Sequence, residues 1–122
     1  SSLHASLLAL GVGEGDEVII PSLTYISSAI AVMYCGARPV LCDNDNDTFN
    51  IDVSLIEKHI TKKTKVIMST DMKGMPVDYN KLNEISKKYG VALITATHDN
   101  EFIKLFDRVY RLENSKLSIS NE

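Results

Sequence analysis

Short apolar runs alternate with segments of helical spacing along the first three quarters of the chain. The runs cover residues 17–20, 39–42, 65–68 and 91–94, and valine, leucine and isoleucine dominate them. Strand-length runs that are apolar on both faces are typical of parallel sheets, because helices cover both faces of such sheets. The pattern therefore predicts an α/β fold with a mostly parallel sheet and helices on both faces.

Helices are predicted before and between these runs. They cover residues 3–10, 24–35, 52–60 and 78–89. Asp52 is suited to cap the third helix at its N-terminus, and Gly90 is suited to end the fourth. Leu82 and Ile85 share the face of the fourth helix that we expect to point inward.

The pattern changes after residue 94. Residues 100–106 predict a short helix, and residues 109–112 and 116–119 alternate as strands around a tight turn at 113–115. We therefore expect a single α/β domain over residues 1–122 that ends in a C-terminal β-hairpin.

Composition narrows the class of protein. The 122 residues are 44% hydrophobic and 24% charged, with a formal net charge of −3, which is typical of one soluble globular domain. There is no basic surface for nucleic acid and no apolar run of the roughly 20 residues that a membrane span needs. The start shows no secretory signal, and Cys35 and Cys42 form no CxxC pair, so we expect a reduced, cytoplasmic protein.

Candidate binding residues follow from the predicted topology, because parallel sheets bind ligands at the carboxyl ends of their strands. Ser1 and Ser2 lie at the start of the first helix, where free N–H groups suit an anion, although plain helix capping is the ordinary alternative. Tyr25 follows the first strand and offers a flat ring for stacking, although tyrosines more often pack. His98 and Asp99 follow the fourth strand, where a surface or capping role is the alternative to catalysis.

Metal binding is not expected. Residues 43–47 look like the start of a calcium loop, but Thr48 and Ser54 occupy the positions where that loop needs glycine and glutamate. A solvated acidic turn is the better interpretation. The three histidines, His4, His59 and His98, have no spacing typical of metal ligands.

Several segments of the sequence resemble the large domain of the DegT/DnrJ/EryC1/StrS aminotransferases, in the same order and with the same spacing as in that family. They cover residues 1–18, 21–25, 36–40, 43–45, 48–52 and 74–78. Members of this family use pyridoxal phosphate to aminate keto-sugars on nucleotide carriers. The resemblance implies part of a type I aminotransferase large domain over residues 1–94, with a nucleotide-linked keto-sugar and an amino donor as partners.

The resemblance also assigns roles to residues. Ser1 and Ser2 fall in the segment that holds the cofactor phosphate, and Tyr25 matches the aromatic residue that stacks on the pyridine ring. Family members are dimers with the active site at the interface, which implies possible self-association.

Other positions depart from the family pattern. Ala96 stands where the family has the Asp that pairs with the pyridinium nitrogen, and Asp71 and Lys73 replace a His and a Tyr. The segment with the Schiff-base lysine is missing from this sequence. We therefore expect weak or absent cofactor binding, no catalytic residue and no transamination by this chain alone.

The tail resembles a different family. Residues 96–99 and 106–117 are similar to the end of ABC-transporter ATP-binding subunits, with His98 as the switch-loop histidine that contacts a γ-phosphate. The Walker motifs of those ATPases are missing here. The sequence therefore predicts a fragment or chimera that joins an aminotransferase-like part to an ATPase-like tail over residues 95–122. A non-catalytic folding or association domain is the alternative, and a nucleotide-binding remnant is the least favoured.

Overall fold

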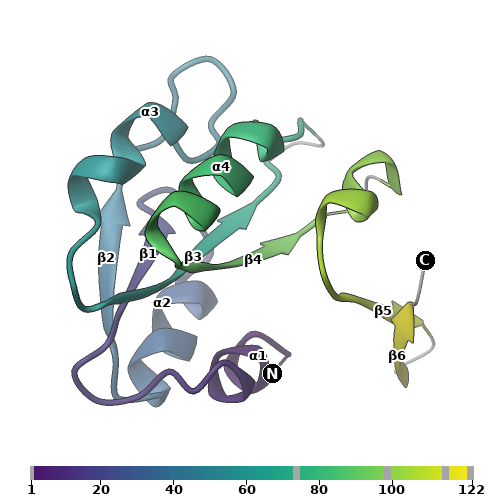
Figure 1. Ribbon diagram of the computed structural model, residues 1–122, viewed down its shortest axis with the longest axis horizontal. Helices are drawn as coiled ribbons and strands as arrows, with labels where there is room; N and C mark the ends of the chain where they lie inside the picture. The colour runs from purple at the N-terminus through teal and green to yellow at the C-terminus, as the bar shows by residue number, and fades with distance from the viewer. Residues whose placement is uncertain (1, 73–74, 98–99, 114–115, 121–122) are drawn as a thin grey trace.

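The computed structural model describes residues 2–72, 75–97, 100–113 and 116–120, and Figure 1 shows their arrangement. In chain order the elements are α1 (Ser2–Ala9), β1 (Glu17–Pro21), α2 (Ile26–Tyr34), β2 (Arg38–Cys42), α3 (Val53–Ile56), η1 (Glu57–His59), β3 (Thr64–Thr70), α4 (Tyr79–Tyr89), β4 (Ala92–Ala96), η2 (Asn100–Leu105), β5 (Val109–Glu113) and β6 (Lys116–Ser120).

Strands β1 to β4 form one parallel sheet in the order β2-β1-β3-β4. Strand β1 lies inside it, and Ile19 pairs with Val40 of β2 on one side and with Ile67 of β3 on the other. All five residues of β1 are buried. The predicted parallel sheet is therefore confirmed.

Each face of the sheet has its own hydrophobic core. On one face Ile19 and Ile67 pack with residues of α3 and α4, among them Ile56 and Leu82. On the other face Val18, Ile20, Val66 and Met68 pack with Leu7 of α1 and Val32 of α2. Figure 1 shows α3 and α4 in front of the sheet and α2 behind it. The predicted helices on both faces are confirmed.

Local residues explain most of the helix ends. Asp52 accepts a hydrogen bond from the Ser54 amide, and Asp78 accepts one from the Lys81 amide. Gly90 ends α4 in the left-handed conformation at φ 65°. The third helix is shorter than predicted, since α3 ends at Ile56 and continues as the 3₁₀-helix η1 to His59.

The second helix also begins later than predicted. Tyr25 has extended backbone angles, φ −64° and ψ 140°, so α2 begins at Ile26. The hydroxyl group of Thr24 lies 3.2 Å from that of Ser28. Residues 22–25 are therefore a loop between β1 and α2.

The tail contributes to the larger core and then forms a separate hairpin. The predicted helix at 100–106 is the 3₁₀-helix η2. Leu105 and Phe106 pack against the core on the α4 side, and the rings of Phe106 and Tyr79 meet edge to face at 5.7 Å. Strands β5 and β6 pair antiparallel in a sheet of their own, as predicted, with β5 extending through Glu113. The rest of the predicted turn, Asn114 and Ser115, lies outside the described residues.

A polar network joins α4 to the carboxyl ends of β3 and β4. The Asp71 carboxylate accepts hydrogen bonds from the Tyr79 hydroxyl, from the Thr97 hydroxyl at 2.6 Å and from the Val77 amide at 3.2 Å. Burial, and then the hydrogen bond to Asp71, raise the pKa of Tyr79 to about 12. The network therefore favours the neutral form of the Tyr79 phenol.

The first prediction concerns the core beneath α4. Leu82 is fully buried, so Leu82→Ala should lower the free energy of unfolding by about 2–5 kcal/mol through lost burial and a cavity. Leu8 of α1 is 53% exposed, and the control Leu8→Ala should change stability by no more than about 0.5 kcal/mol. Urea unfolding followed by circular dichroism measures both. Equal losses for the two variants would contradict the packing described here.

The second prediction concerns pH. Because the folded-state pKa of Tyr79 is raised from 10 to about 12, its contribution is complete below pH 10 and is lost as the pH rises toward 12. This group accounts for up to about 3 kcal/mol of that loss, by the two-unit difference. Tyr79→Phe should be less stable at pH 7, because Asp71 loses a donor, yet should lose less stability between pH 10 and 12. Denaturant titrations of both proteins at each pH measure the difference, and parallel pH profiles would contradict the assignment.

Candidate functional site

The candidate site lies at the carboxyl edge of the sheet. Because β2, β1 and β3 are neighbours, the segments that follow them meet at this edge: residues 43–52, residues 22–25 and, after β3, the described residues 71–72 and 75–78. Ligands of parallel α/β sheets bind at this position.

Tyr25 is the most exposed aromatic side chain that the structure describes here. It occupies the N-cap position of α2 but makes no side-chain capping bond, and its side chain is 83% exposed. A tyrosine presented in this way can stack its face on a planar ring. The structure thus places Tyr25 at the edge of the sheet where the sequence predicts a binding role.

Asn44 anchors the loop that carries Tyr25. Its side-chain oxygen accepts hydrogen bonds from the Leu23 amide at 2.8 Å and from the Ser22 hydroxyl at 3.1 Å. Its side-chain nitrogen donates to the Leu23 carbonyl at 3.3 Å and to the Phe49 carbonyl at 2.7 Å. One side chain therefore connects the loop after β1 to the loop after β2.

Asn50 connects the loop after β2 to the loop after β3. It is only 2% exposed, donates to the Met75 carbonyl at 2.8 Å and accepts from the Met72 amide at 2.7 Å. Sequence reasoning missed Asn44 and Asn50. The one available signal is their position in the loop after a predicted strand, where asparagine often hydrogen-bonds to backbone groups.

Asp45 closes a turn within the acidic run. Asp45 accepts bonds from the amides of Asp47 and Thr48 and from the Thr48 hydroxyl. The Thr48 amide bond, followed by the Asp47 bond, lowers the pKa of Asp45. Within the described part of the chain, no cluster of three or more His, Cys, Asp or Glu residues could hold a metal ion.

Ala96 is the last residue of β4, and Asp71 directly follows the last residue of β3. Ala96 pairs with Thr70 at the end of β4, and its carbonyl lies 3.5 Å from the Asp71 amide. An exposed methyl group at Ala96 provides no acceptor for a protonated ring nitrogen. The nearby Asp71 carboxylate already accepts three hydrogen bonds from Tyr79, Thr97 and Val77.

The other predicted binding residues are not brought together with Tyr25 by any described contact. Ser2 begins α1, but the ring contact from α1 to α2 joins His4 to Tyr34, at the opposite end of α2 from Tyr25. Ser1, Lys73, His98 and Asp99 lie outside the described residues. A phosphate site at Ser1 and Ser2 and a nucleotide contact at His98 therefore stay predictions.

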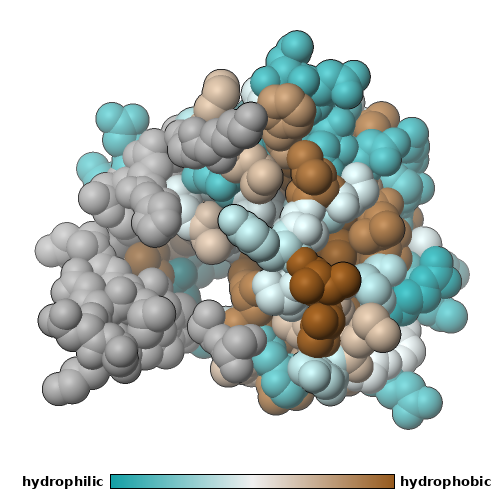
Figure 2. All heavy atoms as spheres, turned by 180° about the vertical axis from the view of Figure 1, so that it is seen from behind, coloured by the Kyte–Doolittle hydropathy of each residue, from teal (hydrophilic) through white to brown (hydrophobic). Residues whose placement is uncertain are grey.

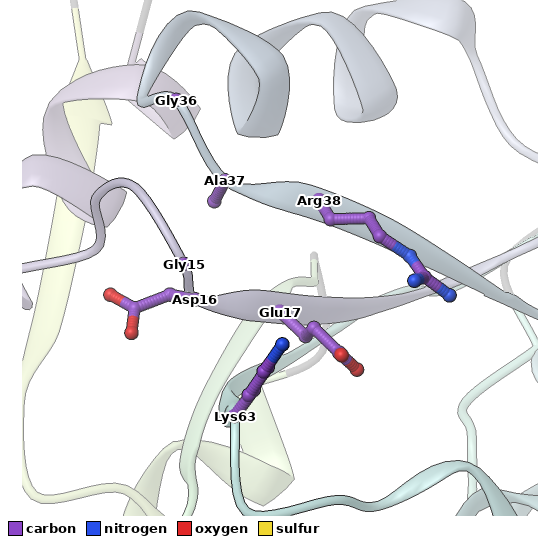
Figure 3. A pocket seen from close by; sticks show the side chains of 7 residues that line it. All are labelled: Gly15, Asp16, Glu17, Gly36, Ala37, Arg38 and Lys63. Atoms are coloured by element: carbon purple, nitrogen blue, oxygen red, sulfur yellow. The ribbon is translucent and has the colours of Figure 1, made fainter.

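A hollow of about 200 Å³ lies at the opposite edge of the sheet, beside the start of β1 and β2 (Figure 3). Its charged lining consists of two carboxylates, Asp16 and Glu17, and two cations, Arg38 and Lys63. Asp16 is bound to the Gly13 amide and forms an ion pair with Lys65. The balanced charges select neither an anion nor a cation, so we assign no ligand to this hollow.

Helix α2 also exposes an apolar stripe. Ile26, Ile30 and Met33 follow one another at helical spacing, and Ile26 is 76% exposed and Met33 62%. Tyr34 is exposed beside them. Figure 2 shows exposed hydrophobic side chains on the side of the molecule where α2 lies. No helix among the described residues is long and apolar enough to cross a membrane.

Curated proteins of known function resemble most of this sequence. GDP-perosamine synthase of Caulobacter vibrioides is 48% identical over 94 residues, which are 77% of this chain and 25% of that protein. UDP-2-acetamido-2-deoxy-3-oxo-D-glucuronate aminotransferase of Pseudomonas aeruginosa is 45% identical over 93 residues, 76% of this chain and 26% of that protein. The chain thus spans about a quarter of the length of these relatives.

Solved structures show the same fold. The crystal structure of 3-amino-5-hydroxybenzoic acid synthase matches 77% of this chain and 24% of its own, with a TM-score of 0.76 and 40% identity. The ntda protein of Bacillus subtilis, solved with bound cofactor PMP, matches 76% of this chain and 21% of its own, with a TM-score of 0.74 and 34% identity. In both structures the matched region is part of an α/β aminotransferase domain, as the sequence predicts.

The sequence profile of the DegT/DnrJ/EryC1/StrS aminotransferase family matches residues 1–99. That range contains the whole parallel sheet and the three loops at its carboxyl edge. The chain belongs to the DegT/DnrJ/EryC1/StrS aminotransferase family.

Proposed function

We propose that this chain carries part of the cofactor-binding surface of a pyridoxal-phosphate-dependent nucleotide-sugar aminotransferase. By itself it binds the cofactor weakly and does not transaminate. The observation that carries the proposal is the exposed Tyr25 ring on an anchored loop at the carboxyl edge of the sheet. When bound, the cofactor supplies an electron sink for amino-group transfer, and the protein supplies its binding and orientation.

The residues fit the cofactor only in part. Tyr25 offers a face for the pyridine ring. The start of α1 is where the sequence predicts the phosphate, although no described contact joins it to Tyr25. Ala96 cannot hold a proton on the ring nitrogen, and the three donors on Asp71 already occupy that carboxylate. Because no residue here would hold a proton on the ring nitrogen, we expect the chain to bind the cofactor weakly and not to catalyse transamination.

The tail supports a junction between two ancestries. The family profile ends at residue 99, and the parallel sheet ends with β4 at Ala96. Strands β5 and β6 pair only with each other among the described strands. We place an aminotransferase part through residue 94 and a tail of different origin over residues 95–122; the profile passes that boundary by five residues, so it supports a different origin only from residue 100 onward.

The third prediction tests cofactor binding by Tyr25. We expect saturable binding of pyridoxal phosphate, followed by absorbance, and a loss of affinity of roughly three- to tenfold in Tyr25→Ala, the size of one aromatic stacking contact. Tyr34→Ala is the matched control, because Tyr34 is an exposed tyrosine at the far end of α2 and contacts His4 instead. Tyr25→Phe keeps the ring and should bind as the unaltered chain does.

The same samples test the absence of a catalytic lysine. Borohydride reduction followed by intact mass should give substoichiometric adducts spread over several lysines. A stoichiometric adduct on one lysine, or conversion of the cofactor to its amine form by an amino donor, would overturn the claim of incompetence. Equal affinities of Tyr25→Ala and Tyr34→Ala would overturn the role of Tyr25.

Self-association is a second candidate function, favoured by the apolar stripe on α2. Ile26, Ile30 and Met33 expose their side chains on a helix whose other face already packs on the sheet. Burying such a stripe against a second copy would remove it from water. In this hypothesis the chain is a non-catalytic association domain.

The fourth prediction tests this association. Met33→Lys places a charge in the stripe and should shift the protein toward monomer in sedimentation velocity at the same concentration. Met75→Lys is the matched control, because Met75 is also exposed but lies in the loop after β3. A monomeric unaltered chain, or equal shifts in both variants, would rule out association through α2.

A further inference from the structure

We propose that Asn44 is a positioning residue that fixes the 22–25 loop and thereby the place of the Tyr25 ring. The inference rests on the proposed cofactor binding by Tyr25 and adds the residue that makes the binding surface ordered. In the sequence, Asn44 is one residue of the acidic turn at 43–47, and the pattern assigns its side chain no role.

The geometry of the contact resembles one rung of a sheet. The backbone pairing of β1 with β2 ends where the Ser22 amide donates to the Cys42 carbonyl at 2.8 Å. One residue further on, the Asn44 side chain pairs with both backbone groups of Leu23, accepting from its N–H and donating to its C=O. The side-chain amide therefore extends the ladder after the backbones of the two strands have separated.

The amide group of Asn44 uses all of its hydrogen-bonding capacity. Its oxygen accepts from Leu23 and Ser22, and its nitrogen donates to Leu23 and Phe49. An aspartate at this position would keep the two acceptor contacts and lose the two donor contacts. An alanine would lose all four.

The Phe49 contact ties this clamp to a second constrained loop. Phe49 has a positive φ of 60°, which is uncommon for a bulky residue, and its amide donates to the Asp45 carbonyl at 2.9 Å. Asn44 thus holds the 22–25 loop against a turn that is itself closed by hydrogen bonds. Asn44 is therefore held in place by its own loop and does not move with the 22–25 loop.

The Tyr25 ring depends on this anchor because its side chain is 83% exposed and makes no capping bond that would hold it. Leu23 lies two residues before Tyr25, and the Tyr25 side chain makes no capping bond to α2. The position of the ring is therefore set by the main chain on its two sides: at α2, where the Tyr25 carbonyl accepts from the Ser28 amide at 3.0 Å, and at the Asn44 clamp on Leu23. Loss of the clamp should release the ring locally, with little effect on the sheet beneath it.

The fifth prediction uses Asn44→Ala, with Asn46→Ala as matched control, because Asn46 is an exposed asparagine of the same loop. Hydrogen exchange of the Leu23 amide, measured by NMR, should become about tenfold faster in Asn44→Ala, the usual size of one lost hydrogen bond. Pyridoxal phosphate affinity should fall by about the same factor as in Tyr25→Ala. Asn44→Asp should lie between the two in exchange rate.

A double variant separates positioning from a general structural role. If Asn44 acts through Tyr25, Asn44→Ala should cause no further loss of affinity in a Tyr25→Ala background. Additive losses, or an affinity unchanged by Asn44→Ala, would overturn the inference while the proposed function stands. If the unaltered chain binds no cofactor, the proposed function fails and takes the cofactor part of this inference with it. The clamp is then judged by Leu23 exchange alone, and equal rates in Asn44→Ala and Asn46→Ala would overturn it.

Discussion

The pairing of β1 with both β2 and β3 is the constraint on which the rest of this structure depends. A strand that is hydrogen-bonded on both sides and buried along its whole length must send alternate side chains into two separate cores. Val18 and Ile20 face the α1 and α2 side, and Ile19 faces the α3 and α4 side. Because the three strands run parallel, their following loops meet at one edge. The same pairing therefore builds the core and the candidate binding surface.

Polar side chains, not apolar packing, organise that edge. Asn44 joins the loop after β1 to the loop after β2, and Asn50 joins the loop after β2 to the loop after β3. Asp71 joins the end of β3 to α4 and to Thr97, the residue after β4. Each accepts hydrogen bonds from backbone amides of the loops that would otherwise depend on water alone. A buried asparagine such as Asn50 is tolerated because its bonds to Met72 and Met75 offset the cost of removing it from water. The loops are consequently ordered by specific contacts, which a surface that orients a ligand requires.

The sequence predicted the sheet and its layers because strands buried on both faces consist mostly of apolar residues. Short apolar runs such as residues 65–68, set between helical segments, favour strands between two cores. Asp52, Asp78 and Gly90 mark helix ends through local chemistry. It could not predict Asn44 or Asn50, because their partners lie 21 to 25 residues away and only the strand order brings them together. The start of α2 was misplaced for a related reason: residues 24 and 25 have no helix-breaking side chain, yet they belong to the anchored loop, in which Tyr25 is extended. The family resemblance supplied a role for Tyr25, which its spacing alone did not.

The segment after β4 shows how residues beyond the family match can share the core of the sheet. Leu105 and Phe106 lie beyond the family match, yet they pack against the core that α4 forms with the sheet, and Phe106 meets the Tyr79 ring. Tyr79 in turn donates its hydroxyl to Asp71 at the candidate edge. Packing is tolerant of the source of its side chains so long as their volume and polarity fit. The segment that covers Tyr79 therefore keeps water from the hydroxyl group that binds Asp71 and so helps to order the loop after β3. This buried tyrosine couples Leu105 and Phe106 to the parallel sheet, although β5 and β6 form a separate sheet.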